Sequence, residues 1–576
     1  MNKNEIASIL DEIAVLLELN GENFFKVRAY QSAARTLQTM DEELGVVIGE
    51  SRLKQVQGIG DALSKKIEIL YKTNELKYYN DLKKLVPSGL VEMLEIPSLG
   101  AKKIKILHSE LKIDNIEKLE KACRAGEVKV LDGFGKKTEE RILLGIKTRK
   151  AYKKRHLWWR ANMIAKPIIE GLRSLKEVDI ADCAGSLRRG METVGDLDFI
   201  VASESPIPVM NWFTSRENVA EVTAKGETKS SVRFDTGLQA DLRVVPFEHY
   251  YFTLHHFTGS KEHNIKMRHR ALKLGFSLSE WGLTPEKSIT EKPIKEIQSE
   301  KDLFEKLELN YIPPELREGR DEIEEAGKGQ LPHLIEEKAI RGVFHNHTTA
   351  SDGNNTLKEM TFAAESFGWE YFGIADHSKA SFQANGLNEE RIEKQIIEIN
   401  KLNNSKTFKI HIFTGIECDI LADGTLDLAP SILSQLDYVV VSVHSSFSLS
   451  EDAQTKRIIR AIEEPNTTML GHLTGRLLLR REGYRINEHK IIDAAIANGK
   501  IIELNASPLR LDMDWRLWKH AAAKGLLCSI NPDAHNTKNL DYIQAGVLTA
   551  RKGGLTEDNI FNTRSLSQVK SYLLNK

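Results

Sequence analysis

Histidines and acids recur between residues 344 and 535, at or just after the ends of short apolar runs. The first group lies in FHNHTTASDG, residues 344–353, where two histidines two positions apart precede an aspartate. Imidazole and carboxylate groups are ligands that Zn²⁺, Mn²⁺ and Fe²⁺ bind in proteins. The set comprises His345, His347, Asp352, His377, Glu417, His444, His472, Asp533 and His535. These donors exceed what one tetrahedral ion needs, so they predict two or three ions sharing a bridging acid.

A second group of acids lies near the middle of the chain. In DLDFIVA, Asp196 and Asp198 are two positions apart in a strand-like run, so both carboxylates face one side. A third acid, Asp241, lies in another apolar run that could pair alongside. Three carboxylates on adjacent strands can hold two Mg²⁺ ions that promote transfer of a phosphate group. From the spacing alone, turn and solvent-face positions for Asp196 and Asp198 remain the favoured alternative.

Seven apolar runs, alternating with helical patterns, position the histidines and acids of the carboxy-terminal region. They are RGVFHNH, YFGIADH, IHIFTGIE, YVVVSVH, TMLGH, KIIELNA and LLCSINPDAH. This alternation predicts a closed or nearly closed β/α barrel, seven-stranded and TIM-like. The carboxyl ends of barrel strands converge on one face, so residues as distant as His345 and His535 would meet in one pocket.

The sequence changes character twice before this region. From about residue 160 to 290, strand-like runs mix with helical segments, which predicts an α+β domain. Residues 309–337 contain paired prolines, several glycines and many acids, a composition typical of an interdomain connection.

Residues 51–160 form a basic block. They contain 26 Lys plus Arg and 14 Asp plus Glu, a surplus of 12. The rest of the chain therefore carries −13, because the whole chain carries −1. Such a block favours a polyanionic partner such as nucleic acid, although solvated helix faces would give the same count.

Three glycine turns recur inside the basic block, in VQGIGDALSKKI (56–67), IPSLGAKKIKIL (96–107) and LDGFGKKTEERI (131–142). Each precedes a Lys-rich or polar helix start, where backbone N–H groups can bind a phosphate. Three copies favour binding of a nucleic-acid backbone over ordinary connectors, and they resemble helix-hairpin-helix motifs. The glycines expected to bind DNA are Gly58, Gly60, Gly100, Gly133 and Gly135.

Length and composition bound the class of protein. A chain of 576 residues predicts about three to five domains, and a hydrophobic content of 41% gives no indication of a disordered, collagen-like or disulfide-framework protein. The four cysteines are far apart and fit a reducing compartment. Residues 1–25 have an amphipathic-helix pattern, and no run reaches the roughly 18 apolar residues of a membrane span. We therefore expect a cytoplasmic protein.

The stretch GSLRRGMETVGDLD, residues 185–198, places small residues and arginines before the two aspartates. Such residues let backbone N–H groups and a guanidinium approach a triphosphate. At this point the sequence resembles the family X DNA polymerases, a nucleotidyltransferase-fold family, over nearly all of residues 1–290. FTGSKEHNIKMRHRALKLGFSLSEWGL, residues 257–283, resembles the family's nucleotide-binding and thumb segment.

This resemblance implies roles for individual residues. Asp196, Asp198 and Asp241 would bind two Mg²⁺ or Mn²⁺ ions, and Asp241 would also activate the primer 3′-hydroxyl. The residues implied to bind the incoming dNTP are Gly185, Ser186, Arg189, Gly195, His256, Phe257, Gly259 and Asn264. His256 stands where the family commonly has a tyrosine, which leaves the strictness of sugar selection open.

The amino-terminal block resembles the family's DNA-end-binding domain and fingers. In relatives with 5′-deoxyribose-phosphate lyase activity, a lysine after the first hairpin forms a Schiff base, and Lys66 occupies the matching place. Neighbouring cations such as Lys65 would lower the pKa of that lysine and favour its neutral form. Ala62 stands where such relatives often have a phosphate-binding lysine, so a simple phosphate contact by Lys66 is the favoured alternative.

Residues 338–576 resemble the polymerase-and-histidinol-phosphatase (PHP) domain throughout, in segments such as HNHTTASDG, GIECDI and NPDAH. The resemblance implies phosphoesterase chemistry at two or three Mn²⁺, Zn²⁺ or Fe²⁺ ions, with all nine ligand positions filled. In bacterial chains that join this domain to a family X polymerase, it is associated with 3′-to-5′ exonuclease, 3′-phosphatase and abasic-site nuclease activity.

We therefore expect a multidomain chain with all-α helix-hairpin-helix domains, an α+β nucleotidyltransferase palm and thumb, and a carboxy-terminal barrel. The predicted order is a DNA-end-binding domain (1–85), fingers (86–155), palm (156–255), thumb (256–315), linker (316–337) and PHP domain (338–576).

The predicted function is DNA-directed DNA synthesis that fills short gaps in DNA repair, combined with trimming of 3′ ends. The expected partners are gapped or nicked duplex DNA with its primer 3′ end, and dNTPs, bound by a monomer that makes no membrane contact. One alternative is a DNA-end-binding repair protein whose PHP domain is structural or acts on small phosphate monoesters. Another is a template-independent or RNA-directed nucleotidyltransferase, which would use the same three aspartates.

Overall fold

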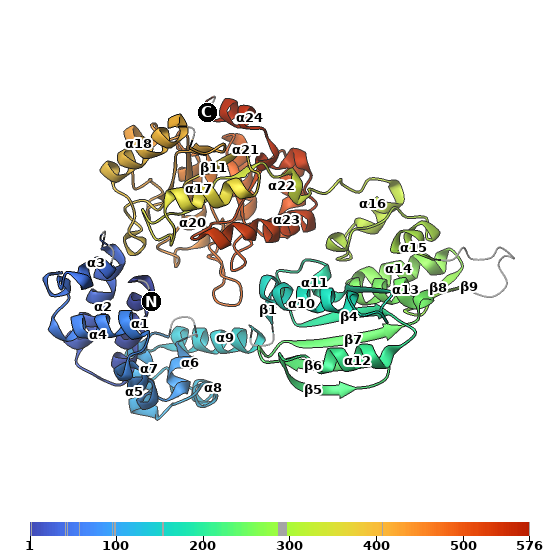
Figure 1. Ribbon diagram of the computed structural model, residues 1–576, viewed down its shortest axis with the longest axis horizontal. Coiled ribbons are helices and arrows are strands. Elements are labelled where there is room, and N and C mark those ends of the chain that lie inside the picture. The colour runs from blue at the N-terminus through green and yellow to red at the C-terminus, as the bar shows by residue number, and fades with distance from the viewer. Residues whose placement is uncertain are drawn as a thin grey trace. The chain divides into compact units, whose positions relative to one another are not determined.

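The computed structural model describes residues 1, 3–40, 42, 44–56, 58–94, 96, 99–152, 155–285, 297–405 and 407–574. Gln57, Pro97 and Ser98 of the first two glycine turns, and residues 286–296 of the predicted thumb, lie outside the described residues. The chain divides into two compact units, one built mainly from residues 1–153 and the other mainly from residues 154–576 (Figure 1).

The first unit is helical. Its elements are α1 (Lys3–Leu19), α2 (Phe24–Thr39), α3 (Leu44–Gly49), η1 (Leu53–Gln55), α4 (Asp61–Thr73), α5 (Lys77–Leu85), α6 (Ser88–Met93), α7 (Ala101–Leu111), α8 (Ile116–Ala125) and α9 (Lys136–Tyr152). Their apolar faces form one core that includes Leu17, Leu37, Ile67 and Ile104. The prediction of an all-α amino-terminal region is confirmed.

Each glycine turn buries its apolar residue and begins a helix. The buried residues are Ile59, Leu99 and Phe134, and the helices that follow are α4, α7 and α9. Gly58 and Gly133 have φ angles of 88° and 76°, which glycine adopts without the steric cost of a side chain. A Cβ atom added at Gly60, Gly100 or Gly135 would point into open space. The start of each helix therefore has room for a ligand.

The second unit begins with a mixed five-stranded sheet in the order β2-β4-β7-β6-β5. The strands are β2 (Ile180–Cys183), β4 (Asp196–Ala202), β5 (Val219–Lys225), β6 (Lys229–Phe234) and β7 (Gln239–Val245). Strands β4 and β7 are parallel, and the other neighbours are antiparallel. Two antiparallel pairs lie outside this sheet: β1 (His156–Leu157) with β3 (Thr193–Val194), and β8 (Phe276–Leu278) with β9 (Leu283–Pro285).

Helices cover both faces of the five-stranded sheet (Figure 1). Phe199 of β4 packs into a core with helices α10 (Trp158–Arg173) and α12 (Pro206–Thr214). The next residue, Ile200, packs against α13 (Phe247–Thr258) on the other face. Because side chains alternate along a strand, the even-numbered positions of β4 face the α13 side. The remaining helices of this region are α11 (Gly185–Arg188), α14 (Lys261–Lys273) and α15 (Glu300–Lys306).

The predicted connection is folded and contains buried charged groups. Its elements are η2 (Pro314–Leu316), α16 (Glu322–Lys328) and η3 (Glu337–Ala339). Arg317 is fully buried, and its Nη1 lies 2.6 Å from Oε1 of Glu300. Arg188 lies 2.7 Å from the other carboxylate oxygen. Burial alone would raise the pKa of Glu300, but the two arginines hold it well below its usual range.

The carboxy-terminal region contains two all-parallel sheets, one of three strands and one of five. The first comprises β10 (Gly342–Val343), β11 (Tyr371–Gly373) and β12 (His411–Phe413). The second comprises β13 (Gly415–Asp419), β14 (Tyr438–Ser442), β15 (Met469–Leu470), β16 (Ile501–Asn505) and β17 (Cys528–Asn531). The seven predicted runs thus contain eight strands among the described residues, because IHIFTGIE divides at Thr414. Its first half pairs with β11 and its second half with β14.

Helices surround these strands (Figure 1). They are α17 (Leu357–Ser366), η4 (Phe382–Ala384), α18 (Glu389–Ser405), α19 (Pro430–Leu433), α20 (Glu451–Ile462), α21 (Glu488–Ala497), α22 (Trp515–Ala523), η5 (Thr537–Tyr542), α23 (Ile543–Lys552), η6 (Glu557–Asn559), η7 (Phe561–Thr563) and α24 (Leu566–Leu574). The residues between strands and helices form the largest core of the chain. Within the described ranges, no helix is long and apolar enough to cross a membrane.

Replacing Arg317 by methionine tests the buried ion pair. The change leaves Glu300 buried with Arg188 as its remaining arginine partner, so we expect the free energy of unfolding to fall by about 3–5 kcal/mol. Urea denaturation followed by tryptophan fluorescence reports on the second unit, because all 7 tryptophans lie in it.

The matched control is Lys301→Met, which removes an exposed ion pair between Lys301 and Glu305 of α15. We expect that variant to change the same free energy by less than about 1 kcal/mol. If both variants lowered the free energy of unfolding by the same amount, burial of the ion pair would not explain its contribution to stability.

Candidate active sites

Three aspartates meet on adjacent strands of the five-stranded sheet. Asp198 of β4 lies directly opposite Asp241 of β7 in the parallel register. Asp196 is two positions before Asp198, on the same face of β4. Asp196 is exposed, and the other two are half-buried. The spacing in the sequence predicted this grouping.

Like charges dominate the surroundings of Asp198. Burial, together with Asp196 and Asp241, raises the pKa of the Asp198 carboxyl to about 7. Asp241 forms an ion pair with Lys229, with 2.9 Å between Oδ2 and Nζ. In the described part of the chain, the three aspartates are not among the groups whose ligand atoms all lie within 4.8 Å of one another. Divalent cations would favour the charged form of Asp198 and would compete with Lys229 for Asp241.

The loop before β4 approaches Asp198 through a glycine. Gly185 has a φ angle of 62°, and a Cβ atom there would lie 2.3 Å from Oδ2 of Asp198. The backbone N–H of Ala184 donates to the carbonyl of Asp198 at 2.8 Å. Gly185 and Ser186 begin the short helix α11, and Gly195 directly precedes β4. This loop therefore lies beside the aspartates, as the sequence predicted.

Arg189 joins this loop to a second predicted nucleotide-binding segment. Its Nη1 donates to the carbonyls of Thr258 and Gly259, at 2.8 and 3.1 Å. Its Nε donates to Glu318 Oε1 at 2.9 Å. The side chain that we expected to bind a triphosphate directly is thus held by backbone carbonyls and a carboxylate.

The turn after α13 brings together the remaining predicted nucleotide-binding residues. Asn264 Nδ2 donates to the carbonyl of His256 at 2.7 Å, and a Cβ atom at Gly259 would lie 2.4 Å from Asn264 Oδ1. Burial lowers the pKa of His256, so its ring is mainly neutral at pH 7. The guanidinium of Arg243 lies 4.2 Å from the centre of the Phe257 ring.

Sequence reasoning missed Arg243. It follows Asp241 by two positions on β7, so period-two spacing places it on the same face as the aspartates. The two-residue spacing could have predicted a cation on the aspartate face, where the triphosphate is expected to bind.

Glu417 is the centre of the histidine-rich cluster. Four histidine rings lie nearest to this buried carboxylate of β13, and a fifth, that of His347, lies 3.8 Å from Oε2. The shortest N–O distances are 3.3 Å to His345, 2.9 Å to His377, 3.2 Å to His444 and 2.9 Å to His472. The two oxygens divide these contacts, since Oε2 faces His345 and His377 while Oε1 faces His444 and His472. A carboxylate placed in this way can bridge ions.

The other predicted ligands lie beside the same cluster. His347 Nε2 is 3.1 Å from Asp533 Oδ1, and His535 Nε2 is 3.4 Å from Asp352 Oδ1. Three groups within the described residues bring their ligand atoms within 4.8 Å of one another. They are His347, Asp352, His377 and His535; His345, His347 and Asp533; and His377, Glu417 and His444. Between them these groups contain eight of the nine predicted ligands, and the ninth, His472, contacts Glu417.

Two further acids orient histidines of this cluster. Glu503 Oε1 lies 2.7 Å from Nδ1 of His345, and Asp419 Oδ1 lies 3.0 Å from Nδ1 of His444. Such outer carboxylates fix the orientation of a ligating ring. Sequence reasoning missed them because Glu503 lies inside β16, and Asp419, the last residue of β13, lies two positions beyond the predicted run IHIFTGIE. Period-two spacing could have found Asp419, which follows Glu417 by two positions.

The protonation of the cluster shows how its charges balance. Burial lowers the pKa of a histidine, but surrounding carboxylates hold that of His345 well above its usual range and raise that of His444 to about 10. The carboxylates likewise raise the pKa of His535 to about 9. Burial and two neighbouring histidines lower the pKa of His347 to about 4. Protons on the first three rings therefore offset the charge of the buried acids.

The donor set fits divalent transition metals. Among the described residues, two buried ring nitrogens of the cluster, His347 Nδ1 and His472 Nδ1, have no hydrogen-bond partner. An unpaired buried nitrogen is costly unless a ligand satisfies it. Metal ions would satisfy such nitrogens and would replace the protons that balance the acids.

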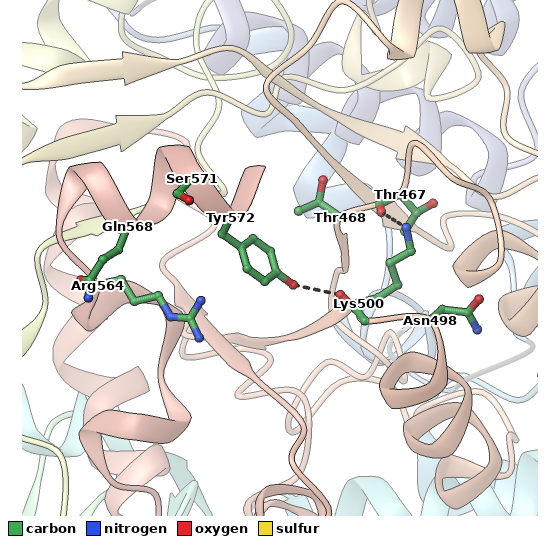
Figure 2. Close-up of a pocket in the computed structure, with 9 residues that line it drawn as sticks. Thr467, Thr468, Asn498, Lys500, Arg564, Gln568, Ser571 and Tyr572 are labelled. Atoms are coloured by element: carbon green, nitrogen blue, oxygen red, sulfur yellow. Dashed lines mark hydrogen bonds between the residues drawn. The ribbon is translucent and has the colours of Figure 1, made fainter. Parts of the chain in front are cut away.

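A pocket of 660 Å³ in the same region is lined by residues outside the predicted ligand set, among them Thr467, Lys500 and Tyr572 (Figure 2). Thr467 and Thr468 directly precede β15, and Asn498 and Lys500 precede β16. The pocket is therefore at the amino ends of these strands, whereas His472 follows the carboxyl end of β15. In Figure 2 the Tyr572 ring lies within the pocket, and its hydroxyl donates to the carbonyl of Gly499 at 2.9 Å.

Lys66 occupies an aromatic site in the first unit. Its ammonium donates to the hydroxyl of Tyr30 and lies 3.8 Å from the centre of the Tyr78 ring. Burial and the nearby Lys26 lower the pKa of Lys66. The neutral fraction of this amine at pH 7 is thus larger than that of an exposed lysine.

Comparison with known families agrees with these sites. Residues 1–76 match the helix-hairpin-helix domain, 90–148 the SAM-like helix-hairpin-helix tandem, 253–318 the DNA polymerase beta thumb and 344–507 the PHP domain. The chain therefore combines elements of a family X polymerase with a PHP domain.

A full-length relative gives the particular family. The chain is 39% identical to the DNA polymerase/3′-5′ exonuclease PolX of Bacillus subtilis (strain 168) over 575 residues, which cover 100% of this chain and 99% of that protein. It belongs to the PolX family of bacterial family X DNA polymerases, and the resemblance seen in the sequence is confirmed.

The carboxy-terminal region has relatives of its own. A probable phosphatase of Thermoanaerobacter sp. (strain X514) is 30% identical over 177 residues, 29% of this chain and 69% of that protein. A probable phosphatase of Aliivibrio fischeri (strain MJ11) is 27% identical over 204 residues, 33% of this chain and 76% of that protein.

Replacing Glu417 by glutamine tests the proposed metal cluster. The neutral amide keeps the shape of the side chain but cannot balance metal ions beside four histidines. We expect Mn²⁺ binding, measured by titration calorimetry, to weaken by about 100-fold or more. Glu398→Gln on the exposed face of α18 is the matched control and should bind as the original chain does. Unchanged binding by Glu417→Gln would contradict a bridging role.

Proposed function

We propose that the chain is a DNA-directed DNA polymerase that fills short gaps and that its PHP region is a 3′-to-5′ exonuclease. The observation that carries the proposal is the presence of two separate acid-rich centres in a chain that matches a polymerase/exonuclease over its full length. We further propose a monomer that binds gapped or nicked duplex DNA and dNTPs in the bacterial cytoplasm.

We assign the domains in the order that the sequence predicted. Residues 1–85 would bind a DNA end, residues 86–155 would form the fingers, 156–255 the palm and 256–315 the thumb. The linker at 316–337 would lead to a PHP domain at 338–576. Isolated parallel bridges, Asn346 with Ala534 and His377 with Glu417, connect the two carboxy-terminal sheets. These bridges support a closed barrel.

DNA synthesis would take place at the three aspartates. Asp196, Asp198 and Asp241 would hold Mg²⁺ or Mn²⁺, which supplies charge stabilisation to the phosphates. Asp241 would accept the proton of the primer 3′-hydroxyl. In the structure Asp241 Oδ2 lies 2.9 Å from Lys229 Nζ, and Asp241 is directly opposite Asp198 in the parallel register.

The loop and turn beside the aspartates would bind the dNTP. Gly185, Ser186 and Gly195 would present backbone groups to the triphosphate. Phe257, Gly259 and Asn264 would contact the sugar and base, with His256 at the position that bears on sugar selection. Arg189 would order this pocket through the carbonyls of the turn, and Arg243 would add positive charge on the aspartate face.

Hydrolysis of the 3′ end would take place at the histidine cluster. Its nine ligands would hold two or three Mn²⁺, Zn²⁺ or Fe²⁺ ions, which activate water for attack on a phosphate. Glu503 and Asp419 would fix the rings of His345 and His444. Attachment to a DNA-binding polymerase raises the local concentration of 3′ ends, which favours a nucleic-acid substrate over a small phosphate monoester.

Separate variants of the two sites test this assignment. We expect Asp198→Ala to lower extension of a gapped primer by at least about 10²–10³-fold and to leave exonuclease activity unchanged. His345→Ala should lose Mn²⁺-dependent release of nucleotides, or of 3′-phosphate, and keep extension. Each variant is the control for the other, measured with and without template. Normal extension by Asp198→Ala, or normal hydrolysis by His345→Ala, would contradict the corresponding assignment.

We also propose that the three glycine turns bind the DNA backbone. Gly58, Gly60, Gly100, Gly133 and Gly135 form these turns, and the positions that precede the helices are open. Lysines of the same helices would add charge without reading the base sequence.

Lys66 would act as the nucleophile of a 5′-deoxyribose-phosphate lyase. Its lowered pKa and its contacts with Tyr30 and Tyr78 favour a neutral, oriented amine. We expect borohydride to trap the full-length chain on an incised abasic site, and Lys66→Ala to lose that product. Lys65→Ala, the exposed neighbour, is the control and should still be trapped. Undiminished trapping of Lys66→Ala would exclude this role.

A further inference from the structure

A buried lysine connects the carboxy-terminal region to the loop beside the aspartates. Lys552 is the last residue of α23, and its side chain is fully buried. Its Nζ lies 2.5 Å from Glu318 Oε1 and donates to the carbonyls of Arg189 and Glu315, at 3.0 and 3.3 Å. An ammonium has three donors, so these contacts can use all of them.

The connection continues from Glu318 into the predicted dNTP pocket. The oxygen that faces Lys552 also accepts the Nε–H of Arg189. Arg189 in turn binds the carbonyls of Thr258 and Gly259. A continuous series of contacts thus runs from the PHP region to both segments that would hold the nucleotide.

Charge balance makes Lys552 important to this series. Burial would raise the pKa of Glu318, but Lys552 and Arg189 together keep it below its usual range. Burial also lowers the pKa of Lys552 to about 8, against the effect of Glu318. Without the ammonium, the two carbonyls that accept from Lys552 would each lose a donor. Glu318 would keep Arg189 as its remaining cationic partner.

The rest of the loop lies against the same helix and its neighbours. A Cβ atom at Gly190, whose φ angle is 64°, would lie 2.7 Å from Cγ of Leu548 in α23. Glu192 accepts a hydrogen bond from Arg476 and lies 3.7 Å from Arg516. Residues of the carboxy-terminal region therefore hold the loop from Gly185 to Glu192 at two of its positions, Gly190 and Glu192.

We propose that Lys552 is a positioning residue for the polymerase: through Glu318 it holds Arg189 and the turn at Gly259 in the conformation that receives a dNTP. The PHP region then has a second function besides hydrolysis, as a structural part of the nucleotide pocket. This inference rests on the proposed location of that pocket.

Steady-state filling of a one-nucleotide gap by the full-length chain tests the inference. Lys552→Met keeps the length of the side chain and removes its charge. We expect KM for the dNTP to rise about tenfold while kcat changes less than about twofold, because the chemistry at the aspartates is untouched. Mn²⁺-dependent exonuclease activity should stay close to that of the original chain, whereas the melting temperature should fall, because Glu318 and two carbonyls lose a buried partner.

Lys519→Met is the matched control. Lys519 of α22 pairs at 2.6 Å with Glu325 of α16 and with Asp321, which directly precedes α16, so it also connects the PHP region to the folded linker. The contacts of Lys519 do not include Arg189 or Glu318. We expect the KM of Lys519→Met for the dNTP to equal that of the original chain. An equal rise of KM in Lys519→Met would show a general docking effect and would overturn the positioning role.

Glu318→Gln gives an independent test if Lys552→Met fails to fold. It should raise KM by a similar factor, and the double variant should show less than the product of the two single effects, because both act through one contact. A folded Lys552→Met or Glu318→Gln with unchanged KM would overturn the proposal. Failure of the pocket assignment itself is distinguishable, since Asp198→Ala would then still extend primers.

Discussion

A buried carboxylate is stable only where a cation or hydrogen-bond donor faces it, and this constraint shapes the whole second unit. Glu300 has two arginines, Glu318 has an arginine and a lysine, and Glu417 has four histidines. Asp198 differs, because its nearest strong influences besides burial are two further carboxylates. The first two acids are balanced by arginine and lysine side chains of the protein. The last two need protons or metal ions.

That difference separates structural acids from candidate catalytic acids. At Glu300 and Glu318, guanidinium and ammonium groups complete the site and join neighbouring segments of the fold. At Glu417 the partners are imidazoles, which can exchange a proton for a metal ion. At Asp198 burial and repulsion from Asp196 and Asp241 raise the pKa, and divalent cations would relieve that repulsion. The same chain therefore uses buried acids to fix the pocket and to supply its chemistry.

Much of the site could be predicted from the sequence because strand geometry is regular. Period-two spacing placed Asp196 and Asp198 on one face, and parallel strands placed distant histidines at one edge. Contacts that depend on tertiary packing could not be read in this way. The spacing does not show that Arg189 is held by Glu318, or that IHIFTGIE changes sheets at Thr414. Helical hairpins were predictable because glycine turns are local features.

We infer that one chain contains two metal centres that differ in their ligands. Anomalous diffraction at the manganese edge would locate both, with crystals of the full chain soaked in Mn²⁺ and a non-hydrolysable dNTP analogue. We expect manganese at Asp196, Asp198 and Asp241, and two or three further ions around Glu417. Peaks at one centre alone, or peaks away from both sets of residues, would contradict it.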